Sequence, residues 1–325
     1  MGKTVKYSVI GTSWITKSFI QGANLTEGLL LDGVYSRSKE KGISFANETG
    51  AMRVFTDFSE LLASDTELVY VASPNICHYS QSKALLESGK HVICEKPITV
   101  TLSEFKELSA LAEEKCLVYF EAIMYMHSPA RKILKDAVAE IGEIRSATFD
   151  FSQLSSKYPA LKSGELPNIF NPEMKTGALN DLGIYCVYPA VDLFGEPDEI
   201  IPSQHFLSTG ADGCGSAVFK YSDKLVTVTY SKLGQSRSAS QIMGDLGTVT
   251  LGSVSQTDNI YLYDNHGKKT ELVPDIDKKY HMANEAKSAY DFITAPEDTQ
   301  KFRAECKKIN EAVLGCMEKM RVENV

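Results

Sequence analysis

Residues 5–16 read VKYSVIGTSWIT, an apolar strand-like run that ends at Gly11 and leads into an amphipathic segment. Up to about residue 121 the chain keeps alternating short apolar runs with amphipathic segments, which is typical of βα units around a parallel sheet. The expected strands lie at 5–10, 29–35, 53–55, 68–72, 91–94 and 117–120. These strands predict a doubly wound parallel α/β sheet.

After about residue 124 the pattern changes to a helix, a long strand, a helix around Asp181 and then β-rich segments between turn signals. Two helices, near 281–294 and 298–321, close the chain. This order predicts an α+β domain with a large, mostly antiparallel open sheet. We therefore expect one domain at 1–123 and a second at 124–325.

The composition excludes several classes of partner. The chain has 325 residues, which suits two domains, and a net charge of -8, which argues against a nucleic-acid or anionic-membrane surface. No stretch approaches the roughly eighteen apolar residues of a membrane span. The seven cysteines are odd in number and contain no CxxC pair, so a reducing cytoplasm is the expected location.

The turn after the first strand holds candidates for binding a dinucleotide. A dinucleotide fingerprint would read G-x-G-x-x-G, and here only Gly11 is present. Ser13 is small enough to let the backbone approach a pyrophosphate, and Trp14 and Ile15 begin a helix whose N-terminus could face that anion. The same turn also occurs in α/β proteins that bind no nucleotide.

Ser36 and Arg37 follow the second strand, with Lys41 a turn later. An acidic residue here would hold a ribose 2′-hydroxyl, whereas an arginine beside hydroxyl groups suits a 2′-phosphate. The sequence therefore favours NADP over NAD, with NAD possible. The alternative is a solvated loop charge.

Ser73, Asn75 and His78 follow the fourth strand. From the strand ends, Asn75 and His78 could reach a ribose or the nicotinamide region of a cofactor. Alternatively, Asn75 belongs to a simple turn and His78 caps a helix.

Glu95 and Lys96 come directly after the fifth strand, on the rim where open α/β sheets bind ligands. Far downstream, Asp181 and Tyr185 are four residues apart, which puts them on one face of a helix. A lysine, a tyrosine and a carboxylate make a proton-transfer set for carbonyl chemistry. The alternative is that Tyr185 belongs to the core and Asp181 is solvated.

The motifs resemble those of the Gfo/Idh/MocA oxidoreductases, and within them the dihydrodiol dehydrogenase-like branch, over almost the whole chain. They are the Gly11 turn, Ser36 with Arg37, SPNxxH at 73–78, EKP at 95–97, Glu121 with Ala122, and GxLxDLGxY at 177–185. Two departures are Ser13 with Thr16 in the fingerprint, and Tyr125 with Met126 where a Trp, Arg pair often stands.

The resemblance implies a Rossmann domain followed by a domain whose open sheet often forms a dimer interface, so a homo-oligomer, dimer or tetramer, is expected. It implies that Lys96 lies at the nicotinamide, commonly with a cis bond before Pro97. It also implies that Lys96, Asp181 and Tyr185 are catalytic, and that Glu95 and Lys96 line the cofactor.

The expected activity is hydride transfer between a nicotinamide cofactor and a sugar, diol or related polyhydroxy compound, which the polar segment Gln153–Lys175 would suit. Tyr185 would be the acid in reduction, with Lys96 tuning its pKa, although Lys96 could itself be the proton donor. A catalytically silent nucleotide sensor is the alternative function. No metal is expected, because His281 and Glu285 lack a nearby third ligand.

Overall fold

The computed structural model describes residues 3–322. The chain divides into two compact units. The first consists of the chain up to Ile123 together with Asp277–Lys308, and the second of Met124–Ile276 together with the chain from Ile309 onward.

This division differs from the expected domains 1–123 and 124–325 at one place. Residues 277–308 pack with the first unit, because α10 (Lys278–Thr294) lies against α1 (Trp14–Ala23). The two helices approach so closely at Gly22 of α1 that a Cβ there would lie 2.5 Å from the backbone of Met282. Periodicity predicted the helix but not which sheet its apolar face would cover.

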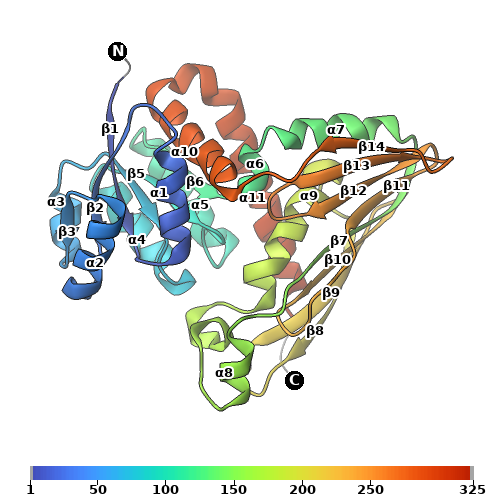
Figure 1. Cartoon of the computed structure of the whole chain (residues 1–325), viewed down its shortest axis with the longest axis horizontal. Coiled ribbons are helices and arrows are strands. Elements are labelled where there is room, and N and C mark those ends of the chain that lie inside the picture. The colour runs from blue at the N-terminus through green and yellow to red at the C-terminus, as the bar shows by residue number, and fades with distance from the viewer. Residues whose placement is uncertain (1–2, 323–325) are drawn as a thin grey trace. The chain divides into compact units, whose positions relative to one another are not determined.

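The first unit is built on six parallel strands in the order β3-β2-β1-β4-β5-β6 (Figure 1), so the predicted doubly wound sheet is confirmed. The strands are β1 (Val5–Ile10), β2 (Leu29–Tyr35), β3 (Arg53–Phe55), β4 (Leu68–Val71), β5 (His91–Glu95) and β6 (Tyr119–Ala122). Its helices are α1, α2 (Lys39–Thr49), α3 (Phe58–Ala63), α4 (Asn75–Glu87), α5 (Leu102–Glu114), α10 and the first part of α11 (Pro296–Met320). The central strands are continuous apolar runs, because helices cover both faces of the sheet.

The second unit holds an eight-stranded sheet in which only β7 and β10 pair in parallel, so the predicted mostly antiparallel sheet is also confirmed. The strands are β7 (Ile144–Ser152), β8 (Glu199–Phe206), β9 (Asp212–Lys220), β10 (Leu225–Ser231), β11 (Ser240–Gly244), β12 (Gly247–Ser253), β13 (Asp258–Asp264) and β14 (Lys269–Val273). The helices are α6 (Met124–His127), α7 (Ala130–Glu140), α8 (Tyr158–Lys162) and α9 (Ile184–Phe194), and α7 and α9 lie on one side of the sheet (Figure 1).

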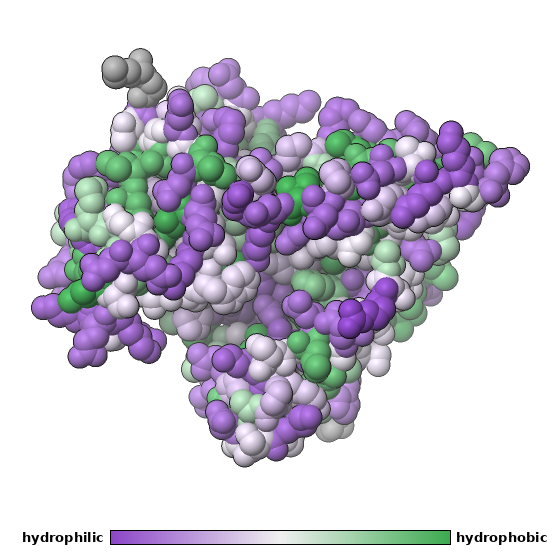
Figure 2. Space-filling view, viewed as in Figure 1, coloured by the Kyte–Doolittle hydropathy of each residue, from purple (hydrophilic) through white to green (hydrophobic). Residues whose placement is uncertain are grey.

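The two faces of this sheet differ in exposure. On β10, Val226, Val228 and Tyr230 are buried, whereas the alternate residues Thr227 and Thr229 are partly exposed. Strand alternation therefore turns the apolar side chains toward the helices and a hydroxyl-rich face away from them. The edge strand β14 is polar, and hydrophilic side chains cover this edge in Figure 2, which discourages pairing with further strands.

No helix within residues 3–322 combines the length and the apolar character needed to cross a membrane.

Candidate active site

The turn between β1 and α1 forms a cradle for an anion. Gly11 has φ +102°, and a Cβ there would lie 2.6 Å from the carbonyl oxygen of Ala72. Only glycine therefore fits this turn. Ser13 is the N-cap residue of α1, but its hydroxyl pairs with that of Thr16 at 3.2 Å and accepts no hydrogen bond from the helix backbone. No acidic residue lies in the first turn of the helix, so its amide groups and dipole can face a phosphate.

A cavity of about 410 Å³ opens beside this turn within the first unit. It is lined by Ile10, Gly11, Thr12, Ser13, Tyr35, Ser36, Arg37, Ser38, Lys41, Ala72, Ser73, Pro74, Cys77 and Gln81. The structure thus brings five predicted cofactor-binding residues together: Gly11, Ser13, Ser36, Arg37 and Ser73. Lys41 adds a second cation near Arg37, and Ser38 accepts a hydrogen bond from the backbone N–H of Lys41. Sequence reasoning missed Thr12, Cys77 and Gln81.

Trp14, Ile15 and Asn75 do not line this cavity. Trp14 is 66% exposed, and the ammonium of Lys278 lies over its ring, 4.2 Å from the ring centroid. Ile15 is half-buried on α1, and Asn75 is the first residue of α4.

His78 is buried, and it joins two loops. Its Nδ1 lies 2.8 Å from the carbonyl oxygen of Pro97 and its Nε2 lies 2.8 Å from that of Ser73. Burial lowers the pKa of His78. Both ring nitrogens face backbone carbonyls, and a neutral imidazole carries a single N–H, so His78 donates a hydrogen bond to one of these two loops. His78 does not line the cavity.

Lys96 follows the last residue of β5, and the Lys96–Pro97 peptide bond is cis, as the family resemblance implied. Glu95 is buried; it accepts a hydrogen bond from the Tyr70 hydroxyl and a longer one, 3.3 Å, from the backbone N–H of Lys96. Burial raises the pKa of Glu95, an effect that the nearby Lys96 opposes. The loop that carries Lys96 is therefore held by a buried carboxyl group at its base.

Helix α10 brings two further ionisable groups to this part of the first unit. Burial lowers the pKa of Lys278, while the charges of Glu95 and Glu285 raise it. Burial also raises the pKa of Glu285 well above its ordinary value, and the charge of Glu95 adds to that effect. Sequence reasoning considered Glu285 only as a metal ligand, since α10 was assigned to the other domain.

Asp181 and Tyr185 belong to the second unit. Asp181 lies in a π-helical turn, Leu179–Gly183, which continues directly into α9 and Tyr185. The amide of Leu179 donates a 2.6 Å hydrogen bond to Asp212, and a Cβ on Gly177 would overlap that carboxylate at 1.9 Å. This close approach explains why a glycine opens the motif. Insertions of π-helix are frequent at functional sites.

The structure adds a lysine to this motif. The carboxylate of Asp181 forms an ion pair with Lys232, whose side chain is only 8% exposed. Tyr185 remains partly exposed, with its ring packed edge-on against Phe151 at 5.4 Å. Lys232 is 51 positions from Asp181 in the chain, so no local sequence pattern connects the two residues.

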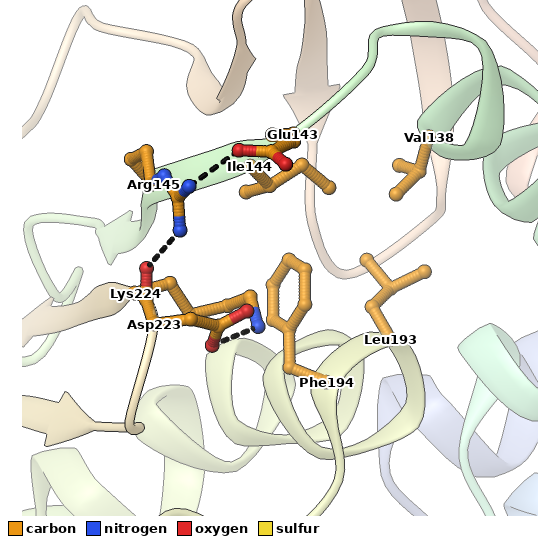
Figure 3. A pocket seen from close by; sticks show the side chains of 8 residues that line it. All are labelled: Val138, Glu143, Ile144, Arg145, Leu193, Phe194, Asp223 and Lys224. Carbon is orange, nitrogen blue, oxygen red and sulfur yellow. Dashed lines mark hydrogen bonds and ion pairs between the residues drawn. The ribbon is translucent and has the colours of Figure 1, made fainter.

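A second cavity, of about 350 Å³, lies in the second unit and holds none of the predicted residues (Figure 3). Its charged groups are paired with one another: Arg145 binds Glu143, and Lys224 binds Asp223 at 2.5 Å. Within residues 3–322, no group of three or more His, Cys, Asp or Glu side chains is arranged to hold a metal ion.

Comparison with known proteins agrees with this architecture. A family model described as "Oxidoreductase family, NAD-binding Rossmann fold" matches residues 5–122, and the "GFO/IDH/MocA C-terminal domain" matches residues 130–250. The chain is 36% identical over 273 residues to the scyllo-inositol 2-dehydrogenase (NADP(+)) IolU of Bacillus subtilis, a match that covers 83% of each protein. It is 26% identical over 264 residues to trans-1,2-dihydrobenzene-1,2-diol dehydrogenase of Oryctolagus cuniculus, covering 79% of this chain and 78% of that protein.

Among solved structures, levoglucosan dehydrogenase in complex with NADH and levoglucosan superposes with a TM-score of 0.81 at 18% identity, covering 98% of both chains. This likeness shows a shared fold. The chain belongs to the Gfo/Idh/MocA family of oxidoreductases, as its motifs predicted. It is an NAD(P)-dependent oxidoreductase.

Proposed function

We propose that this protein transfers a hydride between NADP(H) and a hydroxyl or carbonyl carbon of a sugar, diol or related polyhydroxy compound. NAD is the second-choice cofactor. The cavity beside Gly11, with Arg37 and Lys41 on its wall, is the observation that carries the proposal, because it pairs an anion cradle with two cations suited to a 2′-phosphate. Relatives named for NADP(+) and for inositol or D-xylose support the cofactor and the substrate class.

The first unit would hold the cofactor. Gly11, Ser13 and the start of α1 would face the pyrophosphate, Ser36 with Arg37 the 2′-phosphate, and Asn75 with Glu95 and Lys96 the nicotinamide half. When bound, the nicotinamide ring donates or accepts the hydride. The 410 Å³ cavity can accept the adenosine phosphate portion of such a cofactor.

The second unit would supply the proton. The alkoxide that forms during reduction must be protonated, and a tyrosine, with an ordinary pKa of about 10, can do so when an adjacent ammonium stabilises its phenolate. We assign this role to Tyr185, with Lys96 providing the ammonium and Asp181 orienting the pair. The ion pair between Asp181 and Lys232 supports this, because it fixes the carboxylate one helical turn from Tyr185. Lys96 as the proton donor is the competing assignment.

The decisive experiment replaces Tyr185 by Phe and assays NADPH-dependent turnover of a panel of diols, aldoses, ketoses and dicarbonyls. We expect kcat to fall about a hundredfold or more while NADPH affinity is retained, since the cofactor cavity lies in the other unit. Tyr280→Phe is the matched control, because Tyr280 is 52% exposed and has no part in the proposed site; it should leave kcat unchanged.

If Tyr185→Phe keeps the rate and the pH profile, Tyr185 is not the proton carrier and Lys96 takes that role. If the unmodified protein binds NADPH tightly but turns over no member of the panel, the sensor hypothesis gains instead.

We also propose a homo-oligomer formed through the open face of the eight-stranded sheet. The exposed side of this sheet carries an uncharged row that crosses seven strands: Ile201, Val218, Thr227, Thr148, Gln241, Thr250 and Tyr261. An uncharged row of this length suits an isologous contact between two copies. The seven cysteines are all thiols, which supports a cytoplasmic location.

A further inference from the structure

One wall of the cofactor cavity is formed by α4. Pro74 caps this helix, and Cys77 and Gln81 follow on the same side, so the three residues form one strip along the cavity. Gln81 lies about 9 Å along the helix axis from the first residue of α4, given the 1.5 Å rise per residue. It is therefore well separated from the N-terminal end of this wall.

The side-chain oxygen of Gln81 is buried, and no donor among residues 3–322 forms a hydrogen bond with it. The hydroxyl oxygen of Ser73, which also lines the cavity, is likewise buried and has no hydrogen-bond partner among these residues. A buried acceptor without a partner is costly, so native proteins rarely retain one unless a ligand or a water satisfies it. The side-chain oxygen of Gln81 is thus available to a hydrogen-bond donor that enters the cavity.

The surrounding charges restrict what that donor can be. The phosphate-binding features come from other segments of the lining: the Gly11 turn follows β1, and Arg37 and Lys41 follow β2. A phosphate offers only acceptor oxygens at neutral pH, so it would repel the oxygen of Gln81. The adenine ring offers one exocyclic donor, its 6-amino group, which glutamine side chains pair with in other complexes.

Resting on the proposed NADP-binding function, we propose that Gln81 recognises the adenine base of the cofactor by accepting a hydrogen bond from its 6-amino group. Pro74 and Cys77 pack against the ring on the same wall. Gln81 is therefore a specificity-determining residue for the base, separate from Arg37, which distinguishes the phosphate.

The test is isothermal titration calorimetry of the whole protein with NADP⁺ and with its hypoxanthine analogue, in which a 6-oxo group replaces the 6-amino group. The 6-oxo oxygen is an acceptor and would lie opposite the acceptor oxygen of Gln81. We therefore expect the analogue to bind about ten- to a hundredfold more weakly than NADP⁺. Gln81→Met keeps the length of the side chain but removes its acceptor. It should weaken NADP⁺ binding about tenfold and bring the two ligands to nearly equal affinity.

Ser80→Ala is the matched control, because Ser80 is an exposed neighbour on α4 that does not line the cavity. It should leave both affinities unchanged. Equal affinity of the unmodified protein for both nucleotides would overturn the role of Gln81 while leaving the proposed function intact. Binding of neither nucleotide would instead overturn the proposed function. The ratio measured on the unmodified protein decides the matter even if Gln81→Met fails to fold.

Discussion

At the scale of single residues, the preference for a phosphorylated cofactor depends on Arg37. Its guanidinium lines the cavity beside Ser36, where a 2′-phosphate would be bound by charge-assisted hydrogen bonds. We expect Arg37→Ala to weaken NADP⁺ binding about ten- to a hundredfold and to change NAD⁺ binding little, because NAD⁺ lacks that phosphate. Dissociation constants for both nucleotides provide the measurement.

Lys39→Ala is a suitable control for this prediction, because Lys39 is an exposed cation nearby that does not line the cavity. An equal loss of affinity for the two nucleotides would mean that Arg37 contacts a part that they share.

At the scale of elements, a neutral histidine adds a hydrogen bond to the start of the pairing between β5 and β6. Nδ1 of His91 accepts a hydrogen bond from the backbone N–H of Val118 at 3.0 Å, which a protonated nitrogen could not do. Burial lowers the pKa of His91 from 6.5 to about 4. The unfolded chain therefore takes up a proton at a higher pH than the folded chain.

The contribution of the neutral His91 to the free energy of unfolding is thus fully present above pH 6.5, and it is lost as the pH falls from 6.5 toward 4. The shift corresponds to at most about 3 kcal/mol of unfolding free energy. Urea unfolding between pH 7 and pH 5 should show a steeper loss for the unmodified protein than for His91→Gln, which does not titrate. Parallel pH profiles would contradict this account.

The elements show why prediction succeeded unevenly. In the first sheet, β1, β2 and β3 match their predicted bounds, because buried parallel strands are apolar throughout. In the second sheet the expected strands lay at 144–151, 217–219, 226–230, 248–251 and 260–263, so β8, β11 and β14 were not anticipated. The exposed residues of the edge strands β8 and β14 interrupt the apolar pattern.

The candidate site was predicted unevenly for a related reason. Helix α4 carries polar and apolar residues on all sides, so its sequence does not indicate which side faces the cavity. Asn75 and His78 were chosen because they follow the end of the fourth strand, whereas Cys77 and Gln81 line the cavity. The turn residues Gly11, Ser36 and Ser73, which the strand ends locate directly, do line the cavity. Lys232 and Lys278 come close to the motifs only through tertiary packing.

At the scale of the whole molecule, the first unit is completed by a segment that the chain supplies only after the second unit. Phe292 of α10 is buried and packs against Phe120 at 5.1 Å. We expect a fragment of residues 1–123 to lack a cooperative unfolding transition, because it leaves this apolar surface exposed. Joining 277–308 to it through a Gly/Ser linker should restore cooperativity, as followed by circular dichroism during urea unfolding. Cooperative unfolding of 1–123 alone would contradict the packing described here.

The proposed oligomer is also a property of the whole molecule. Glutamates introduced together at Thr227 and Thr148 would place like charges on neighbouring strands and, across a two-fold axis, opposite their copies. We expect this double variant to sediment as a monomer while the unmodified protein sediments as a dimer or tetramer. Replacing Thr270, on the exposed edge strand β14, by Glu is the control and should leave the mass unchanged. An unmodified protein that is monomeric at all concentrations would rule out the assembly.

The position of Trp14 has an optical consequence. It is the only tryptophan in the chain, it stands at the first turn of α1, and the ammonium of Lys278 lies over its indole ring. All ultraviolet indole emission from this protein therefore originates at one known place, next to the anion cradle. The intensity and wavelength of this emission should therefore report on events at the anion cradle in the native chain, without an attached dye.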